Sequence, residues 1–359
     1  MKNLKAQGFV LLDVDVVALN NAGSKKTDNY DNAVITKSIR KNGNNYVYVS
    51  GQAWRFWWRD SLQKNSGWNL SPVIREAKIA YTEANPLKYA DDDVFGYMRA
   101  AKGLVLDDDG NPVLDKKGKE KTENVTVTRI SPLKNSAIIS VASVRPEENW
   151  SSMSRQNDNS VPYGKQEYSA IMKGMFSLDL AQVGTFSNYN KTGYVNLSDI
   201  LKKEALDNGA VEIDDEFVPS HKLIRISKDT RIQRATDTIK ALKNISGGAM
   251  QTNNMGDVTP KFIVLATTTT GNHPFSHIAT KTGAYDEYAT LDIDALKEVI
   301  SDYKNDFEGK IFIGKRAGFM DEKNDALAGL VTEFSDLIEL TTINKAIDNY
   351  CEQIKNQMD

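Results

Sequence analysis

The residues Ser50-Gly51-Gln52-Ala53-Trp54-Arg55-Phe56-Trp57-Trp58-Arg59-Asp60 hold three of the five tryptophans of this chain. They follow the alternating run Tyr46-Val47-Tyr48-Val49, which is typical of a strand, and Ser50-Gly51 interrupts the alternation. Helical spacing would place Trp54, Trp57 and Trp58 on one face with Ser61, and Arg55 beside Arg59. We therefore expect a short helix that buries an aromatic stripe and points two guanidinium groups outward, where they could bind phosphate.

The overall composition is that of a folded, soluble protein. The chain has 359 residues, enough for one elaborated domain or two ordinary ones, with 40% hydrophobic and 26% charged residues. No apolar run approaches the roughly 20 residues of a membrane-spanning helix, and the first residues lack a signal-peptide core. Cys351 is the single cysteine, which excludes an internal disulfide and favours a reducing, cytoplasmic location. With only three histidines and no Cys/His grouping, the sequence argues against a zinc site, and we expect no cofactor and no membrane partner.

The net charge of −3 conceals an uneven distribution of charge along the chain. Residues 285–359 contain 8 basic and 17 acidic residues, a local charge of −9, so the first 284 residues carry +6. Within that basic part, residues 37–64 have six basic side chains against Asp60, and residues 221–243 have seven against Asp229 and Asp237. Because local basic patches decide whether a polyanion binds, the net charge does not exclude a nucleic-acid ligand.

The periodicity of apolar residues predicts an α+β fold. We expect strands at residues 8–19, 36–41, 133–144, 168–180 and 262–266, and helices at residues 199–206, 229–244, 292–304 and 332–356. Asn42-Gly43 should turn the second of these strands back on itself. In the strand at 168–180, Met172, Gly174 and Phe176 share one side of the pleat.

The segments between these elements are polar or rich in turn residues. Residues 20–26 predict a polar loop, residues 66–130 an insertion, residues 145–165 a polar excursion, and residues 245–256 a glycine-rich loop. The insertion contains Asp91-Asp92-Asp93 and Asp107-Asp108-Asp109, which we interpret as solvated loops. No repeat or long low-complexity linker separates independent domains.

This order of elements, together with four short motifs, resembles a known family. The motifs are Leu19-Asn20-Asn21-Ala22-Gly23, Ser50-Gly51-Gln52-Ala53-Trp54-Arg55, Asp91-Asp92-Asp93-Val94-Phe95-Gly96-Tyr97 and Gly247-Gly248-Ala249-Met250-Gln251. The chain resembles the backbone subunit of CRISPR-associated Cascade surveillance complexes, in the DevR-type branch of the RAMP superfamily found in type I-B systems. The resemblance implies one elaborated domain over residues 1–359 with a modified ferredoxin-like (RRM-type) core and large insertions forming palm, fingers and thumb. The fingers would be residues 66–130, the thumb residues 145–167, and an acidic helical part at residues 285–359 would close the core.

The resemblance also implies a function in antiviral defence. Subunits of this family polymerise head to tail along a CRISPR RNA (crRNA), and a thumb flips out a base at regular intervals. The exposed segments of the guide then pair with target DNA. The implied partners are crRNA, target DNA through the guide, further copies of this chain, and the large, small and crRNA-end-binding Cascade subunits. A subunit that accepts any guide should contact phosphates and sugars and leave sequence reading to base pairing.

Local basic or polar character and the resemblance together give the candidate RNA-binding residues. They are Asn20, Asn21, Ser24, Lys25, Lys26, Lys37, Arg40, Gln52, Arg55, Arg59, Lys165, Lys173, Arg231, Arg234, Gly247, Gly248, Met250, Gln251, Thr252 and Asn253.

Each group of candidates also has a purely structural interpretation. Arg55 and Arg59 could form salt bridges, for instance with Asp60 or Glu76, and Arg231 and Arg234 could belong to a solvated helix face. The segment from Gly247 could be a helix C-cap, or bare backbone N–H groups could approach the RNA. The tryptophans, and Met172 and Met175 near the thumb, could simply pack in the core.

Two other classes of function remain open from the residues alone. One is a metal-dependent ribonuclease that uses the aspartate runs, although neither run has the spacing of a calcium loop. The other is a regulatory protein of the DevR kind that acts through protein partners. Ser/His/Asp catalysis finds no support, because His273 and His277 flank Pro274 without a nucleophile elbow nearby. We expect a protein without enzymatic activity.

Overall fold

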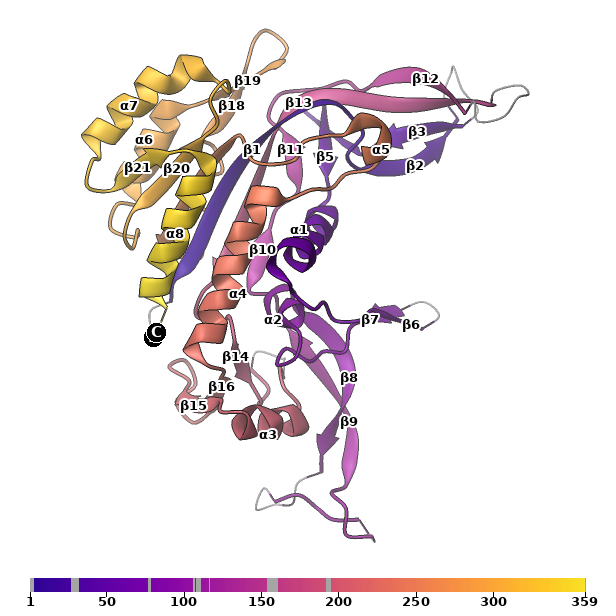
Figure 1. The fold of residues 1–359 in the computed structure, drawn as a ribbon, viewed down its shortest axis with the longest axis vertical. Helices are drawn as coiled ribbons and strands as arrows, with labels where there is room; N and C mark the ends of the chain where they lie inside the picture. Colours follow the sequence, from indigo (N-terminus) through magenta and orange to yellow (C-terminus); the bar gives the residue numbers. More distant parts are fainter. Residues whose placement is uncertain are drawn as a thin grey trace.

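The computed structural model describes residues 3–26, 32–76, 79–105, 107, 111–115, 117–153, 161–191 and 195–358. The fold is α+β, as the sequence predicts, and one large sheet runs through it (Figure 1). The strands follow the order β21-β20-β17-β1-β13-β11-β5-β4 across this sheet. Their bounds are β1 Lys5–Val17, β4 Ser38–Lys41, β5 Asn44–Val49, β11 Ile138–Ser140, β13 Val161–Asp179, β17 Phe262–Thr268, β20 Ile311–Lys315 and β21 Ile338–Thr341. In the described residues, no helix is long and apolar enough to cross a membrane.

Strand β1 lies at the centre of the sheet because its side chains are apolar on both faces. It pairs antiparallel with β13 on one side and with β17 on the other. Ala6, Val10 and Leu12 point to one hydrophobic core, while Phe9 and Leu11 point to a second core on the opposite face. This alternation is the ordinary consequence of the two-residue period of a strand.

Three helices cover the first face of the sheet: α1 (Gly51–Ser66), α4 (Lys228–Lys240) and α8 (Ile343–Gln357). The predicted aromatic stripe of α1 is confirmed, since Trp54, Trp57 and Trp58 are buried in this core. Trp54 stacks on Trp58 at 5.3 Å, and Phe176 of β13 meets Trp58 edge-on at 5.1 Å. A Cβ atom at Gly174 would lie 3.0 Å from the Trp54 ring, so the glycine lets the strand approach the helix.

The opposite face is covered by the C-terminal part of the chain. Helices α6 (Ile293–Asp302) and α7 (Asn324–Glu333) pack there, next to the hairpin of β18 (Ala279–Thr282) and β19 (Tyr288–Leu291). The sequence predicts this part as helical, and the predicted helix at 292–304 is confirmed. The helix predicted at 332–356 begins only at Ile343, because β21 and the end of α7 occupy its first residues. The C-terminal part also adds β20 and β21 to the main sheet.

A β-structured arm projects from the other end of the sheet (Figure 1). It consists of β2 (Asn21–Lys25), β3 (Ala33–Thr36), β12 (Glu147–Met153) and the first part of β13. The prediction of a loop at residues 20–26 is therefore wrong, since β2 pairs with β3 and backbone hydrogen bonds overcome the turn preference of these residues. The expected turn at Asn42-Gly43 is confirmed, with φ of 51° and 82° joining β4 to β5.

Smaller elements extend from the lower part of the molecule in Figure 1. They are α2 Ala90–Phe95, α3 Asp199–Asp207, β6 Ile74–Glu76, β7 Ile79–Tyr81, β8 Tyr97–Leu104, β9 Thr122–Arg129, β14 Thr185–Ser187, β15 Val211–Asp214 and β16 Lys222–Arg225. The β8–β9 hairpin is the most protruding of these, and it lies within the segment predicted as an insertion. Strand β10 (Leu133–Asn135) instead belongs to the main sheet, where it pairs antiparallel with β13.

The three aspartates of α2 are buried, which corrects their interpretation as a solvated loop. Asp91 accepts hydrogen bonds from Arg59 and from the Ser71 N–H. Asp92 accepts from the Asn85 N–H at 2.9 Å, and burial raises the pKa of its carboxyl group. The second run lies only partly in the described residues: Asp107 is exposed, and Asp108 and Asp109 fall outside them.

Asp93 is the most connected of the three. Its carboxylate, with no exposed surface, pairs with Arg129 of β9 and, at 2.7 Å, with Arg234 of α4, and it also accepts the Gly184 N–H. The Arg129 guanidinium additionally donates to the carbonyl oxygens of Gln182 and Thr185. One carboxylate thus joins α2, β9, α4 and the segment before β14. Burying these charges is tolerable because each has charged and hydrogen-bonding partners.

We expect Asp93→Asn to lower the free energy of unfolding by about 3 to 5 kcal/mol, since it leaves two buried guanidinium groups without their carboxylate. Asp60→Asn is the matched control: Asp60 pairs with the exposed Lys64 at the surface, and its loss should cost less than about 1 kcal/mol. Urea denaturation followed by circular dichroism measures both. Equal midpoints for the two variants would contradict the role given to Asp93.

Candidate nucleic-acid interface

The segment that follows β1 joins three parts of the chain that the sequence singles out. The Asn20 side-chain oxygen accepts a hydrogen bond from the Ser50 N–H at 3.0 Å, and the Asn20 carbonyl accepts one from the Lys37 N–H at 2.8 Å. The carbonyl of Leu19 accepts from the Ala249 N–H at 3.0 Å. The predicted residues of the first loop, of the start of α1 and of the glycine-rich loop therefore lie at one corner of the sheet (Figure 1).

The glycines of the loop are required by close packing. A Cβ atom on Gly247 would lie 2.2 Å from the Trp57 ring, and one on Gly248, where φ is 117°, would lie 2.8 Å from the Leu19 side chain. Gln251 closes the loop by donating to the carbonyl oxygens of Gly247 and Gly256. The loop contains a short helix, α5 (Gln251–Asn254), which the sequence does not predict.

The exposed residues of this corner are the ones open to a ligand. Gln52, Thr252 and Asn253 are exposed, while Met250 and Gln251 are half-buried. Phe56, 67% exposed, lies one helical turn after Gln52 on the same side of α1. An exposed aromatic ring beside polar groups is what stacking on a base requires. Phe56 is not singled out from the sequence, because the prediction for this helix considers only its tryptophans and arginines.

A groove of about 1320 Å³ lies between the arm and the β4–β5 hairpin. Among its lining residues are Lys25, Lys26, Thr36, Ser38, Arg40, Asn44, Asn45, Arg145, Glu147, Glu148 and Gln166. We call it the arm groove. Lys25, Arg40 and Arg145 are exposed there, so three cationic side chains line the same groove. Arg145 is not among the candidates predicted from the sequence, because the prediction looks for segments rich in basic residues and Arg145 lies outside them.

Two of the arginines predicted to bind RNA, Arg55 and Arg59, bind groups of the protein itself instead. The Arg55 guanidinium donates to the carbonyl oxygens of Leu133 and Phe95, and burial with the neighbouring charge of Arg59 lowers its pKa to about 10. Arg59 forms a salt bridge, as the alternative interpretation holds, but with Asp91. The expectation that α1 points both guanidinium groups outward is wrong. Carbonyl groups and the Asp91 carboxylate, contributed by later parts of the chain, need hydrogen-bond donors, and the two arginines supply them.

The same correction applies to α4. Arg231 is 2% exposed and Arg234 is 6% exposed, where the sequence predicts that both lie off the apolar face of the helix. Arg231 donates to the Val183 carbonyl, and Arg234 binds Asp93. An RNA phosphate cannot reach these groups in this conformation, so we do not retain them as candidates. The apolar spacing of the helix is confirmed, with Ala235 and Ile239 buried.

Two further lysine candidates, Lys165 and Lys173, have partners within the protein. Lys165 pairs with Glu167 at 2.7 Å in the arm. Lys173 donates to the Ser276 carbonyl at 2.9 Å, and burial, aided by the charge of Lys41, lowers its pKa. Of the two methionines considered for stacking, Met172 is fully buried and Met175 packs against the second core.

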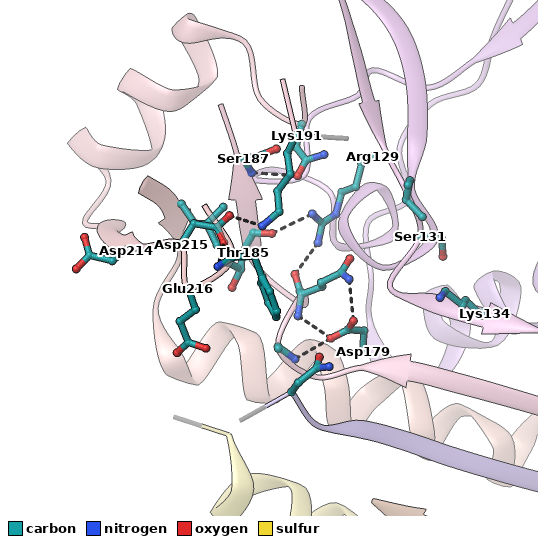
Figure 2. A pocket seen from close by; sticks show the side chains of 17 residues that line it. Arg129, Ser131, Lys134, Asp179, Thr185, Ser187, Lys191, Asp214, Asp215 and Glu216 are labelled. Atoms are coloured by element: carbon teal, nitrogen blue, oxygen red, sulfur yellow. Dashed lines mark hydrogen bonds and ion pairs between the residues drawn. The ribbon is translucent and has the colours of Figure 1, made fainter. Parts of the chain in front are cut away.

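A second cavity, of about 360 Å³, lies beside β14 and β16, and Arg129 and Asp179 are among the residues that line it (Figure 2). Its charged groups are largely matched within the protein: Lys191 pairs with Asp215, and Asp179 pairs with Lys5. Across the described ranges, no three His, Cys, Asp or Glu side chains are grouped so that they could hold a metal ion. The ring of His273, from the loop after β17, contacts the Gly8 carbonyl at 2.9 Å.

Comparison with known families identifies the chain. Residues 10–291 match the family described as CRISPR-associated negative auto-regulator DevR/Csa2. The chain belongs to this family. The match extends from β1 to the last residue of β19 and includes α1, the arm and the glycine-rich loop, so the resemblance to the DevR-type family inferred from the sequence motifs is confirmed. The acidic residues from Asp292 onward lie outside the match.

Solved structures also superpose on most of this DevR/Csa2 family member. One chain of a CRISPR RNA-guided surveillance complex has 9% sequence identity and a TM-score of 0.47, covering 97% of this chain and 99% of that chain. A chain of a second structure, described as "CRISPR RNA-guided surveillance complex, pre-nicking", has 10% sequence identity and a TM-score of 0.48. The alignment covers 98% of this chain and 100% of that chain. A search of curated proteins gives no match.

We expect Gly247→Ala to lower the free energy of unfolding by about 1 to 3 kcal/mol, because the added methyl group overlaps the buried Trp57 ring. Gly271→Ala is the control, since a Cβ atom there meets nothing within 4 Å, and its effect should stay within about 0.5 kcal/mol. Thermal unfolding by calorimetry compares them. If both variants unfold at the same temperature as the wild type, Trp57 does not hold the glycine-rich loop in place.

Proposed function

We propose that this protein is a guide-RNA-binding backbone subunit of a type I Cascade complex, without catalytic activity of its own. The observation that carries this proposal is the meeting, at one corner of the sheet, of the β1 terminus, the glycine-rich loop and the cationic arm groove. Membership of a CRISPR-associated family supplies the biological context. Target recognition would pass to base pairing between the guide and DNA.

The chemistry of the corner suits a ligand of variable sequence. Lys25, Arg40 and Arg145 offer cations for phosphates, and Gln52, Thr252 and Asn253 offer polar contacts to the sugar-phosphate backbone. Phe56 offers a stacking surface that accepts any base. Such groups bind the backbone and the flat faces of bases without distinguishing one base from another.

The central strands support a modified ferredoxin-like core. Neighbouring strands β17, β1, β13 and β11 are all antiparallel. Helix α1 lies in the connection from β1 to β11, and α4 lies in the connection from β13 to β17. This is the β-α-β-β-α-β sequence of the ferredoxin-like motif with additional elements inserted. On this assignment the arm corresponds to the thumb and the β8–β9 hairpin to the fingers.

Assembly into a filament requires two different surfaces on each copy. A heterologous contact that does not close generates a helical array. The acidic residues beyond position 285 and the basic part before it could provide complementary surfaces for successive copies. The other proposed partners are crRNA, target DNA and the large, small and crRNA-end-binding subunits. Asp91 and Asp93 are committed to structural ion pairs, so we assign them no catalytic role.

The proposal predicts that the protein, expressed together with a CRISPR array and the other Cascade subunits, purifies with discrete guide RNA. The ratio of absorbance at 260 to 280 nm and gel electrophoresis of extracted RNA measure this. Protein that remains free of nucleic acid with all subunits present would contradict RNA binding and would favour a regulatory role through protein partners.

Within the arm groove, Lys25→Ala, Arg40→Ala and Arg145→Ala should each weaken binding of single-stranded RNA and reduce the slope of log K against log salt by about one or less. The reason is that each lost cation removes one phosphate contact and its released counterion. Lys64→Ala is the control, because Lys64 lies on α1 away from the groove and pairs with Asp60. Fluorescence anisotropy over a salt series measures these affinities, and unchanged slopes in all three groove variants would exclude the groove as a phosphate site.

A further inference from the structure

The cavity beside β14 and β16 shares no lining residue with the arm groove. Its volume of about 360 Å³ lies in the range of pockets that bind small molecules. The small sheet that contains these strands has two different faces. Phe186 and Ile224 pack on one face in a small core with α3, whereas Ser187 and its register partner Leu223 line the cavity. The cavity is therefore a second candidate site, separate from the candidate nucleic-acid interface.

Most charged groups around the cavity already have partners. Asp179 pairs with Lys5, and Asp215 pairs with Lys191 at the opposite wall. The Arg129 guanidinium belongs to the buried ion-pair network of α2 and donates to two backbone carbonyl groups. Because these charges are neutralised within the protein, they do not decide which ligand the cavity accepts.

Two polar side chains of the lining remain free. Ser187 is 3% exposed, and its N–H donates to the Asn196 side chain at 3.0 Å. The Ser187 hydroxyl makes no hydrogen bond within the described part of the chain. Lys134 of β10 is exposed and has no ion-pair partner among the described residues. A polar group that is almost buried without a partner is uncommon, and one that lines a cavity is available to a ligand.

Two apolar side chains at the rim of the cavity are exposed. Phe217 is 76% exposed and Ile130 is 51% exposed. The loop of Phe217 is nevertheless fixed, because the Asp215 carboxylate accepts hydrogen bonds from the Phe217 N–H at 2.9 Å and from the Tyr189 hydroxyl. The Lys191 ammonium lies 5.5 Å from the centroid of the Phe217 ring. A ring that is exposed but already ordered loses little entropy when it binds a ligand.

These groups restrict the class of ligand. A lysine ammonium group binds an anionic group, a hydroxyl donates or accepts a hydrogen bond, and a phenyl ring packs against another flat ring. Figure 2 shows Lys134 and Asp214 on opposite sides of the cavity, with the Asp214 carboxylate pointing away from the other labelled side chains. The anionic end of a ligand is therefore accommodated beside Lys134, and its apolar body between Phe217 and Leu223.

We infer that this cavity binds a small aromatic anion, with the anionic group at Lys134 and the ring against Phe217. A carboxylate, a phosphate ester or a sulfonate has the required charge. This site goes beyond the proposed RNA binding and does not depend on it.

The probe is anilinonaphthalene sulfonate, a fluorescent aromatic anion, and its uncharged counterpart phenylnaphthylamine is the matched ligand. Both are titrated against the full chain. The wild type should bind the sulfonate about tenfold more tightly, the gain expected for one contact with a charged group. Lys134→Ala should abolish this preference, and Phe217→Ala should weaken binding of both compounds about three- to tenfold.

The control variants make the same changes outside the cavity. Lys64→Ala and Phe56→Ala remove exposed side chains of α1 that do not line it, and they should leave both affinities within about twofold. Ser187→Ala should weaken both compounds about threefold, since both carry an N–H group that the hydroxyl can accept. It should leave the melting temperature unchanged, because the hydroxyl has no partner in the protein.

Equal affinity of the wild type for the two compounds, or an unchanged preference in Lys134→Ala, would overturn the inference. Equal losses in Phe56→Ala and Phe217→Ala would overturn it as well, because the probe would then be binding exposed rings at large. Phenylacetate or phenyl phosphate should displace the sulfonate, and failure of both would contradict an aromatic-anion site. Single-stranded RNA should not displace it; displacement would assign the cavity to the nucleic-acid interface instead.

Discussion

The Asp93 carboxylate is the interaction on which the arrangement of the helices depends. It is buried on α2 and holds Arg129 from β9 and Arg234 from α4. Without a shared anion the two guanidinium groups would repel each other, and α4 could not lie against the segment that precedes β14. Because α4 also packs against α1 and α8, this one ion pair network fixes the layer of helices over the sheet and the position of α1. The tryptophans of α1 then meet β13 in a defined register.

The candidate interface follows from that layer. Helix α1 brings Ser50 to the end of β1, and Trp57 determines where the glycine loop passes. Strand β13 continues without interruption from the core into the arm, so the arm groove has a rigid connection to the same sheet. The groups proposed to bind RNA are thus carried on elements that the hydrophobic core positions, although most of them lie at its edge. Precise placement of polar groups generally requires such support.

Arginines and lysines of this chain occur in two different environments, buried within the protein or exposed at the groove. Arg55, Arg129 and Arg234 satisfy buried carbonyl and carboxylate groups, whereas Lys25, Arg40 and Arg145 lie exposed around a groove. Arginine suits both tasks because its planar fork of donors matches carboxylates and phosphates equally well. The number of basic residues in a sequence window therefore does not predict whether a given arginine or lysine is buried in structural contacts or exposed at the groove.

The sequence by itself determined the features that rest on local spacing. The buried stripe of α1, the strands β1 and β17, the turn at Asn42-Gly43 and the helices α3 and α4 follow from periods of 2 and 3.6 residues and from turn chemistry. The family resemblance followed from short motifs in order. Only the tertiary structure decided the roles of the arginines, the burial of Asp91–Asp93 and the pairing of residues 21–25 as a strand. Their partners are distant in sequence, 36 residues for Asp93 with Arg129 and 141 for Asp93 with Arg234, and no local pattern encodes such a pairing.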